Sequence, residues 1–213
     1  FPTRRSSDLG YQALRYNTTG SKNTATGYQA LYASTTAVEN TAIGHSAMLN
    51  ITTGGYNVSL GYNAMSNANT SQQCTAIGHS AMKNGSPYDS TAIGAYAAFQ
   101  ATSGRDITAV GRASLYSLST GSNNTAIGTN STLNVTSGSS NAAIGHGTGQ
   151  TLTTGSNNTF LGKDANVDSA SSSYRTVIGS GATGTVDNSV TLGRSVDTVY
   201  IPGTLNSSSD ITV

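Results

Sequence analysis

Histidine and cysteine are the residues of this chain best able to bind a metal, and the histidines are regularly placed. A five-residue motif ending in glycine, typified by Asn-Thr-Ala-Ile-Gly, recurs along the chain. His45, His79 and His146 each follow the last glycine of one copy, and Tyr11 and Tyr28 hold that place in other copies. If successive phrases stack as parallel strands about 4.8 Å apart, His45 and His79 lie about 9.6 Å apart. Histidines sharing a zinc ion need bonds of about 2.1 Å. We therefore predict no metal site and interpret this position as a turn that accepts flat polar rings. The alternative is that three copies of one histidine meet across a trimer axis.

Other patterns that could carry chemistry have simpler explanations. Residues 179–184 match the G-x-G-x-x-G of dinucleotide-binding loops, but that motif needs a helix after it, and the sequence that follows predicts a strand. Ser80 and Lys83 have the spacing of a β-lactamase nucleophile pair, yet Ser80 only repeats the position of Ser46. Acidic residues are scattered singly, so no carboxylate pair indicates acid–base catalysis. We predict no catalytic residues, no cofactor and no enzyme activity.

Cys74 is the single cysteine, which excludes an intrachain disulfide framework and a cysteine-cluster metal site. It stands where other repeats have Asn57 and Asn124. We predict that Cys74 is a small buried substitute for asparagine. An interchain disulfide is the alternative.

The composition excludes several function classes. Charged residues make up 9% of the 213 residues and hydrophobic residues 35%, against roughly 25% and 45–50% (the latter counting glycine) in typical domains. The formal net charge of +1 provides no field for nucleic acid or an anionic membrane. No run approaches the roughly 18 apolar residues of a membrane span. We expect no nucleic-acid partner, no membrane span in this segment and no conventional two-layer core.

The first nine residues, FPTRRSSDL, differ from the rest of the chain. They are similar to a translated sequencing-library adapter, so we expect residues 1–9 not to be native and the native N-terminus to be missing. A missing signal peptide then carries no information about export.

A repeated phrase, typified by Asn-Thr-Ala-Ile-Gly, dominates the remaining sequence. Nine of the eleven intervals between its closing glycines are 17 residues, and the other two are 16 and 14. Such regularity indicates a repeat architecture. The closing glycines, which we expect to lie in turns, are Gly10, Gly27, Gly44, Gly61, Gly78, Gly94, Gly111, Gly128, Gly145, Gly162, Gly179 and Gly193.

The position before each glycine is apolar in nearly every repeat, and threonine or valine usually stands two residues earlier. This alternation predicts a short strand with one buried face. A second apolar segment, such as Ala30-Leu31, predicts a second short strand, since the segments are too short for a stable helix. We expect the repeat core to comprise Ile43, Leu60, Ile77, Ile93, Val110, Ile127, Ile144, Leu161, Ile178 and Leu192.

The predicted fold is an all-β, parallel β-solenoid over residues 10–193, with one coil per 17 residues or so. Like residues then stack on like at about 4.8 Å, forming a rod roughly 53 Å long. Burying one isoleucine contributes about 1.5–3 kcal/mol, whereas ordering each residue costs about 1–2 kcal/mol. A coil with so few apolar residues must bury more apolar surface than it can bury alone, and we therefore predict a homo-oligomer. Residues 194–213 are expected to lead into a missing C-terminal region.

The repeat resembles a known family. Residues 187–193, DNSVTLG, are similar to the Asn-Ser-Val-Ala-Ile-Gly motif in head repeats of YadA-like trimeric autotransporter adhesins, and the 14-residue interval before Gly193 matches the family's usual repeat. The resemblance implies a left-handed parallel β-roll, a homotrimer, an extracellular position on the bacterial surface, and attachment to a host-cell or matrix ligand. The Gly-Tyr-Gln-Ala-Leu phrases and residues 195–205 also resemble bacteriophage tail fibres, which leaves a virion fibre as the first alternative.

Our leading functional hypothesis is a non-enzymatic structural or adhesive segment of a homotrimeric surface fibre. The second alternative is an ice-binding solenoid, because regular hydroxyl columns on a flat sheet could order water. Besides the threonines of the predicted strand, a second hydroxyl column comprises Thr19, Thr36, Thr53, Thr70, Ser103, Thr120, Ser137 and Thr154.

Overall fold

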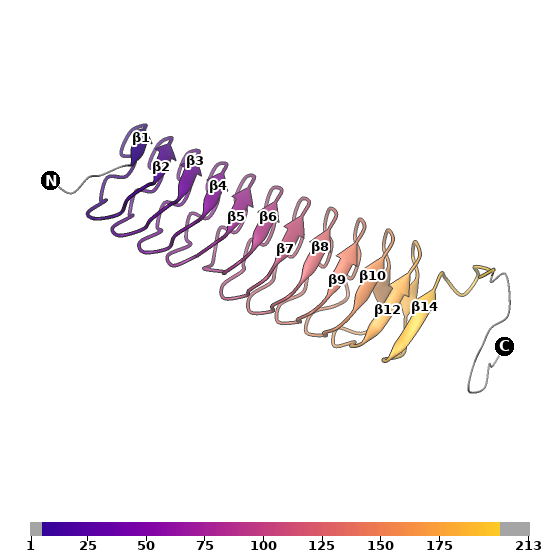
Figure 1. Cartoon of the computed structure of the whole chain (residues 1–213). Helices are drawn as coiled ribbons and strands as arrows, with labels where there is room; N and C mark the ends of the chain where they lie inside the picture. Colours follow the sequence, from indigo (N-terminus) through magenta and orange to yellow (C-terminus); the bar gives the residue numbers. More distant parts are fainter. Residues whose placement is uncertain (1–5, 201–213) are drawn as a thin grey trace.

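The chain forms a β-solenoid in a computed structural model that describes residues 6–200 (Figure 1). Twelve short strands of these residues lie side by side in one parallel sheet, in the order of the sequence except that β11 and β13 pair separately. The strands of the main sheet are β1 (Ser7–Leu9), β2 (Thr24–Thr26), β3 (Thr41–Ile43), β4 (Val58–Leu60), β5 (Thr75–Ile77), β6 (Thr91–Ile93), β7 (Thr108–Val110), β8 (Thr125–Ile127), β9 (Ala142–Ile144), β10 (Thr159–Leu161), β12 (Arg175–Ile178) and β14 (Ser189–Leu192).

The predicted register is confirmed. Ile43 of β3 pairs with Leu60 of β4, and Leu60 pairs with Ile77 of β5, so equivalent positions stack along the rod. The one 16-residue repeat keeps this order, because Ile77 still pairs with Ile93. Among residues 6–200 there is no helix, and therefore none that is long and apolar enough to cross a membrane.

The inward face of the strands carries the middle residue, not the residue before the glycine. Alternate residues of a strand face opposite ways, and the middle positions are buried throughout β2 to β12. This inner column comprises Ala25, Ala42, Ser59, Ala76, Ala92, Ala109, Ala126, Ala143, Phe160 and Val177.

The predicted core column is therefore wrong for the single chain. Ile43 is 40% exposed and Ile127 39% exposed, while Ile77 and Val110 are half-buried. Leucine and methionine side chains of the opposite wall fill most of the interior, so alanine fits behind the strand and the larger side chains of the strand lie outside. The other exposed members of the column are Leu60, Ile93, Ile144, Leu161, Ile178 and Leu192.

The second apolar segment of each repeat is mostly a turn, which corrects the prediction of two strands per coil. Gln29 and Leu31 have φ of 53° and 52°, and Met48 has φ of 51°. Left-handed residues at alternate positions curl the segment, and bonds between coils continue, as Leu31 N–H donates to Ala47 O at 3.0 Å. In the described part of the chain, a second sheet occurs only near the C-terminal end, where β11 (Asn166–Val167) pairs with β13 (Thr183–Gly184).

Larger apolar side chains fill the interior from the wall opposite the strands. One column holds Leu31, Met48, Met65, Met82 and Leu115, all buried. A second column, which our sequence analysis missed, holds Ile51, Leu118, Val135 and Leu152.

Phe160 compensates where the first of these columns runs out. At Gly149 that column has no side chain, and a β-carbon built there would lie 3.2 Å from the Phe160 ring. The phenylalanine thus occupies space that leucine or methionine fills in earlier coils, so packing density is kept while the column changes.

A buried asparagine ladder closes the corner before β2, β3, β4, β8, β9 and β10. The Asn40 side-chain amide donates to Asn23 Oδ1 at 3.2 Å and to Gly54 O at 3.0 Å, and Asn23 Oδ1 also accepts from Asn40 N–H. Each amide therefore satisfies the polar backbone of its neighbours, as buried polar groups require. The ladder comprises Asn23, Asn40, Asn57, Asn124, Asn141 and Asn158, and is interrupted by Cys74, Ser90 and Ile107.

The closing glycines occupy the predicted turns. Gly128 has φ of +133°, a conformation that side chains disfavour, and a β-carbon there would overlap the carbonyl oxygen of Gly145 in the next coil. Every closing glycine in the described part of the chain has positive φ.

The N-terminal end of the array includes part of the segment assigned to an adapter. Strand β1 lies within the nine residues assigned to an adapter, yet its backbone continues the register, with Leu9 paired to Thr26. The adapter origin stays a prediction. Residues 1–5, and residues 201–213 of the expected transition segment, lie outside the described residues.

Candidate functional site

The outer strand face is the surface formed by the first and third residues of the three-residue strands, with Thr176 and Ile178 at the equivalent places in β12 and Val190 and Leu192 in β14. Threonine or another β-branched residue recurs in its first column, and isoleucine, leucine or valine in its second. From β2 to β14 it measures roughly 50 by 10 Å, on the order of 500 Å². The largest apolar patch on a typical monomeric protein measures about 300–600 Å² and often serves binding.

The apolar column on this face is an energetic liability for an isolated chain. Covering a side chain such as Ile43 or Ile127, each about two-fifths exposed, would contribute about 1–2 kcal/mol at roughly 25 cal/mol per Å². Because the column continues without a charged residue from Ile43 to Leu192, these contributions would accumulate along one line.

A second surface feature is the aromatic ladder, which begins at the position after the closing glycine. Tyr28, His45 and Tyr62 stack with ring centroids 4.8 and 5.1 Å apart, and Tyr62 stacks on His79 at 5.2 Å. Such pairs contribute about 0.5–1.5 kcal/mol each. The ladder comprises Tyr11, Tyr28, His45, Tyr62, His79, Tyr96, Phe99 and Tyr116.

The aromatic ladder agrees with the interpretation of this position as a turn for flat polar rings. Tyr62 stands between His45 and His79, which keeps the two imidazoles from sharing an ion. Across the described part of the chain, no group of three His, Cys, Asp or Glu residues could hold a metal.

The remaining candidates for chemistry lie in structural positions. Cys74 is a free, buried cysteine, as predicted, and burial raises the pKa of its thiol to about 11, so it stays neutral. Its Sγ contacts the carbonyls of Gln72 and Pro87 at 3.2 and 3.3 Å. Residues 179–184 contain β13 and are followed by β14, not by a helix, so they lack the helix N-terminus that would bind a phosphate.

A buried arginine ends the asparagine ladder near the C-terminal end. Arg175 donates from Nη1 to Asp168 Oδ1 and from Nε to Asp187 Oδ1, both at 2.6 Å, and from Nη1 to Gly184 O at 2.7 Å. Its guanidinium hydrogen bond is the main cause that holds the pKa of Asp187 below the usual value. The cluster ties β12 to the two loops beside it.

Comparisons with family models, curated proteins and solved structures gave no match to this chain.

Sequence reasoning missed two parts of this arrangement. The column of Ile51, Leu118, Val135 and Leu152 could have been found, because Leu118, Val135 and Leu152 recur at 17 residues. The outward direction of Ile43 and its equivalents carries no such signal, since alternation defines two faces without saying which one is buried.

Proposed function

We propose that this chain is a non-enzymatic structural and adhesive segment of an extracellular surface fibre, in which three copies pack against one another through the outer strand face. The observation that carries the proposal is the continuous apolar column from Ile43 to Leu192, exposed or half-buried at every member. The number three comes from the resemblance to YadA-like head repeats.

The size of the outer strand face bears on how copies would pack. Its roughly 500 Å² is less than the about 800 Å² that each partner buries in a standard interface. The turns beside the strands would have to contribute the rest. Charge does not oppose this association, because the face carries threonine and aliphatic side chains along its length.

Adhesion by such a rod would depend on the regular spacing of equivalent side chains along it. Equivalent side chains recur once per coil along the array, so a ligand that binds one coil weakly can engage several, and linked contacts raise the overall affinity by avidity. The ligand would be a component of a host cell surface or extracellular matrix. A bacteriophage tail fibre would use the same geometry. Recovery of the full reading frame separates the two, because a C-terminal membrane barrel supports the adhesin and a self-cleaving chaperone supports the virus.

Native mass spectrometry of the purified chain tests the assembly. The proposal predicts a particle of three times the 21.6 kDa chain mass that survives dilution to micromolar concentration. A stable single-chain particle at high concentration would rule out packing through the outer strand face.

A specific observation also favours ice binding as a second candidate. Thr41, Thr75, Thr91 and Thr108 lie in one column of the parallel sheet. Val58 and Ala142 interrupt this column, which weakens a regular water lattice. Thermal hysteresis of the purified protein would support the candidate, and its absence would dispose of it.

A further inference from the structure

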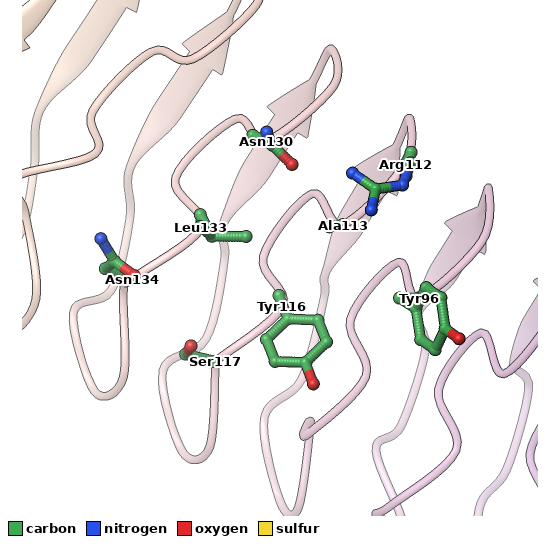
Figure 2. A pocket seen from close by; sticks show the side chains of 8 residues that line it. All are labelled: Tyr96, Arg112, Ala113, Tyr116, Ser117, Asn130, Leu133 and Asn134. Carbon is green, nitrogen blue, oxygen red and sulfur yellow. The ribbon is translucent and has the colours of Figure 1, made fainter.

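A surface cavity of about 650 Å³ lies where the aromatic ladder ends (Figure 2). It spans three successive coils, and its walls include Tyr96, Arg112, Tyr116, Asn130 and Leu133. Its volume falls within the roughly 300–1,000 Å³ of small-molecule sites. In Figure 2, Arg112 and Leu133 extend toward each other across the hollow.

A change in one column of the repeat creates this hollow. The position after the closing glycine holds Tyr62 and His79 in earlier coils, but Ala95, Arg112 and Thr129 in the next three. The ring at this position is therefore absent from these coils, where Tyr96, one residue further on, continues the stack from His79, and in the next coil the cation Arg112 takes the place of a ring.

Tyr116 presents an aromatic face beside the cavity. One face of its ring stacks on Phe99, with centroids 5.0 Å apart and planes within 1°. The equivalent residue in the next coil is Leu133, which has no ring and lines the cavity. The face of Tyr116 on that side, together with Leu133, offers a flat apolar surface.

The polar groups around the cavity have spare hydrogen-bonding capacity. Arg175 and Arg194 pair with aspartates, whereas among residues 6–200 Arg112 forms no ion pair and its guanidinium donates no hydrogen bond. The Asn130 amide is likewise without a partner in that part of the chain. Asn134 donates to Gln150 O at 2.8 Å and keeps its carbonyl oxygen for other contacts.

We propose that this cavity binds a carboxylated sugar, a uronic or sialic acid residue of a glycan. The Arg112 fork matches a carboxylate with two parallel hydrogen bonds. The apolar face of the sugar ring packs on Tyr116 and Leu133, and the Asn130 and Asn134 amides bind its hydroxyls. This ligand class deepens the proposed attachment function, on which its biological role rests, but binding itself requires one chain only.

The charge of the cavity favours a carboxylate over a phosphate. Arg112 is the charged residue among those that line it, so one positive charge meets one negative charge. A phosphate monoester carries about −1.5 to −2 charges at neutral pH, which would leave negative charge uncompensated at this site.

Calorimetric titration of the purified chain tests the proposal, with N-acetylneuraminic acid and glucuronic acid as probes and glucose and N-acetylmannosamine as their neutral counterparts. We expect the acids to bind at least tenfold more tightly than the neutral sugars. Arg112→Gln should abolish that preference, and Tyr116→Ala should weaken acidic and neutral sugars alike. Arg105→Gln is the matched control, because Arg105 lies over the Tyr88 ring, away from the cavity.

Three results would overturn the proposal: equal binding of acidic and neutral sugars, unchanged binding by Arg112→Gln, or inorganic phosphate binding as tightly as the sugars. Arg112 is exposed, so Arg112→Gln should keep the wild-type melting curve, which is recorded beside each titration. Particle mass measured on the same samples reports the proposed assembly independently, so that either proposal can fail without the other.

Discussion

The two faces of each strand differ in solvent exposure, although their residues are neighbours in sequence. Ala42 is fully buried, whereas the next residue, Ile43, is 40% exposed. The same contrast holds at Ala126 and Ile127. The smaller apolar residue is inside because the side chains that reach in from the opposite wall, such as Met48, leave room for little more than a methyl group behind Ala42. The larger residue is outside, where only another molecule can cover it.

This difference teaches that two kinds of packing are encoded in one short motif. The inner column is completed by the chain itself, together with the asparagine ladder and the columns of Leu31 and Ile51. The outer column is only partly covered by the described residues of its own chain, and the proposed contact between copies would account for its regularity.

Aspartate placed on each face in turn should give the largest contrast. Ala126→Asp buries a charge without a partner and should destabilise the fold by roughly 3–5 kcal/mol. Ile127→Asp places its charge outside, so the single chain should change by less than about 1 kcal/mol, while the oligomer dissociates. Urea melts followed by circular dichroism measure the first effect, and light scattering measures the second. Equal destabilisation of the chain by both changes would contradict the assignment of the faces.

Glycine substitutions should give the next largest contrast. In Gly128→Val the side chain would overlap the Gly145 carbonyl at a φ of +133°, and we expect a loss of roughly 3 kcal/mol or more. Gly181→Ala is the control, because its φ is +67° and the nearest atom, Arg194 Cδ, lies 3.6 Å away. It should cost only about 1–2 kcal/mol. Thermal melts of both variants check the order, and the reverse order would show that the turns do not stack closely.

Removal of a buried asparagine should have a moderate effect. The Asn141 amide donates to Asn124 Oδ1 and Gly155 O and accepts from the Asn158 amide. Asn141→Ala leaves these buried groups without a hydrogen-bond partner and should lower the free energy of unfolding by about 2–3 kcal/mol. Asn50→Ala removes only an exposed bond to Asn67 and should cost about 0.5 kcal/mol or less. Urea melts that gave the two variants equal losses would show that the ladder does not stabilise the interior.

The smallest expected effect is on the pH dependence of stability. Arg175 lowers the pKa of Asp187 in the folded state. The stability that the ionised Asp187 contributes is therefore fully present above the unfolded pKa of about 3.9, and it is lost as pH falls through the folded pKa. Asp187→Asn should therefore flatten the decline in melting temperature below about pH 4. If Asp187→Asn left that decline unchanged, Asp187 would be ionised to the same extent in the folded and unfolded states.

The sequence predicts the repeat geometry well because that information is local. The glycines at 17-residue intervals determine the register, and the recurring asparagines predict a ladder that the structure contains. The burial of Cys74 follows from its place in that ladder. Each of these inferences needs only the identity of residues at one equivalent position.

Two features could not be obtained this way, for physical reasons. Ala42 and Ile43 are both apolar, and the choice between them depends on how far the side chains of the opposite wall fill the interior, which is a property of the whole coil. The left-handed backbone at Leu31 and Met48 has no local signal, because such residues ordinarily avoid positive φ. The handedness of the solenoid and the number of chains stay predictions drawn from the resemblance.

Oxidative crosslinking at the outer strand face tests the central claim most directly. Ile127→Cys is made in a Cys74→Ser background, since Ser90 already occupies the equivalent position in the next coil. Thr120→Cys, in an exposed turn of the same coil, is the control. If the face joins copies of the chain, mild oxidant should give covalent dimers of the first variant at concentrations where the second stays monomeric. Equal crosslinking of the two variants, or none at position 127, would contradict the account.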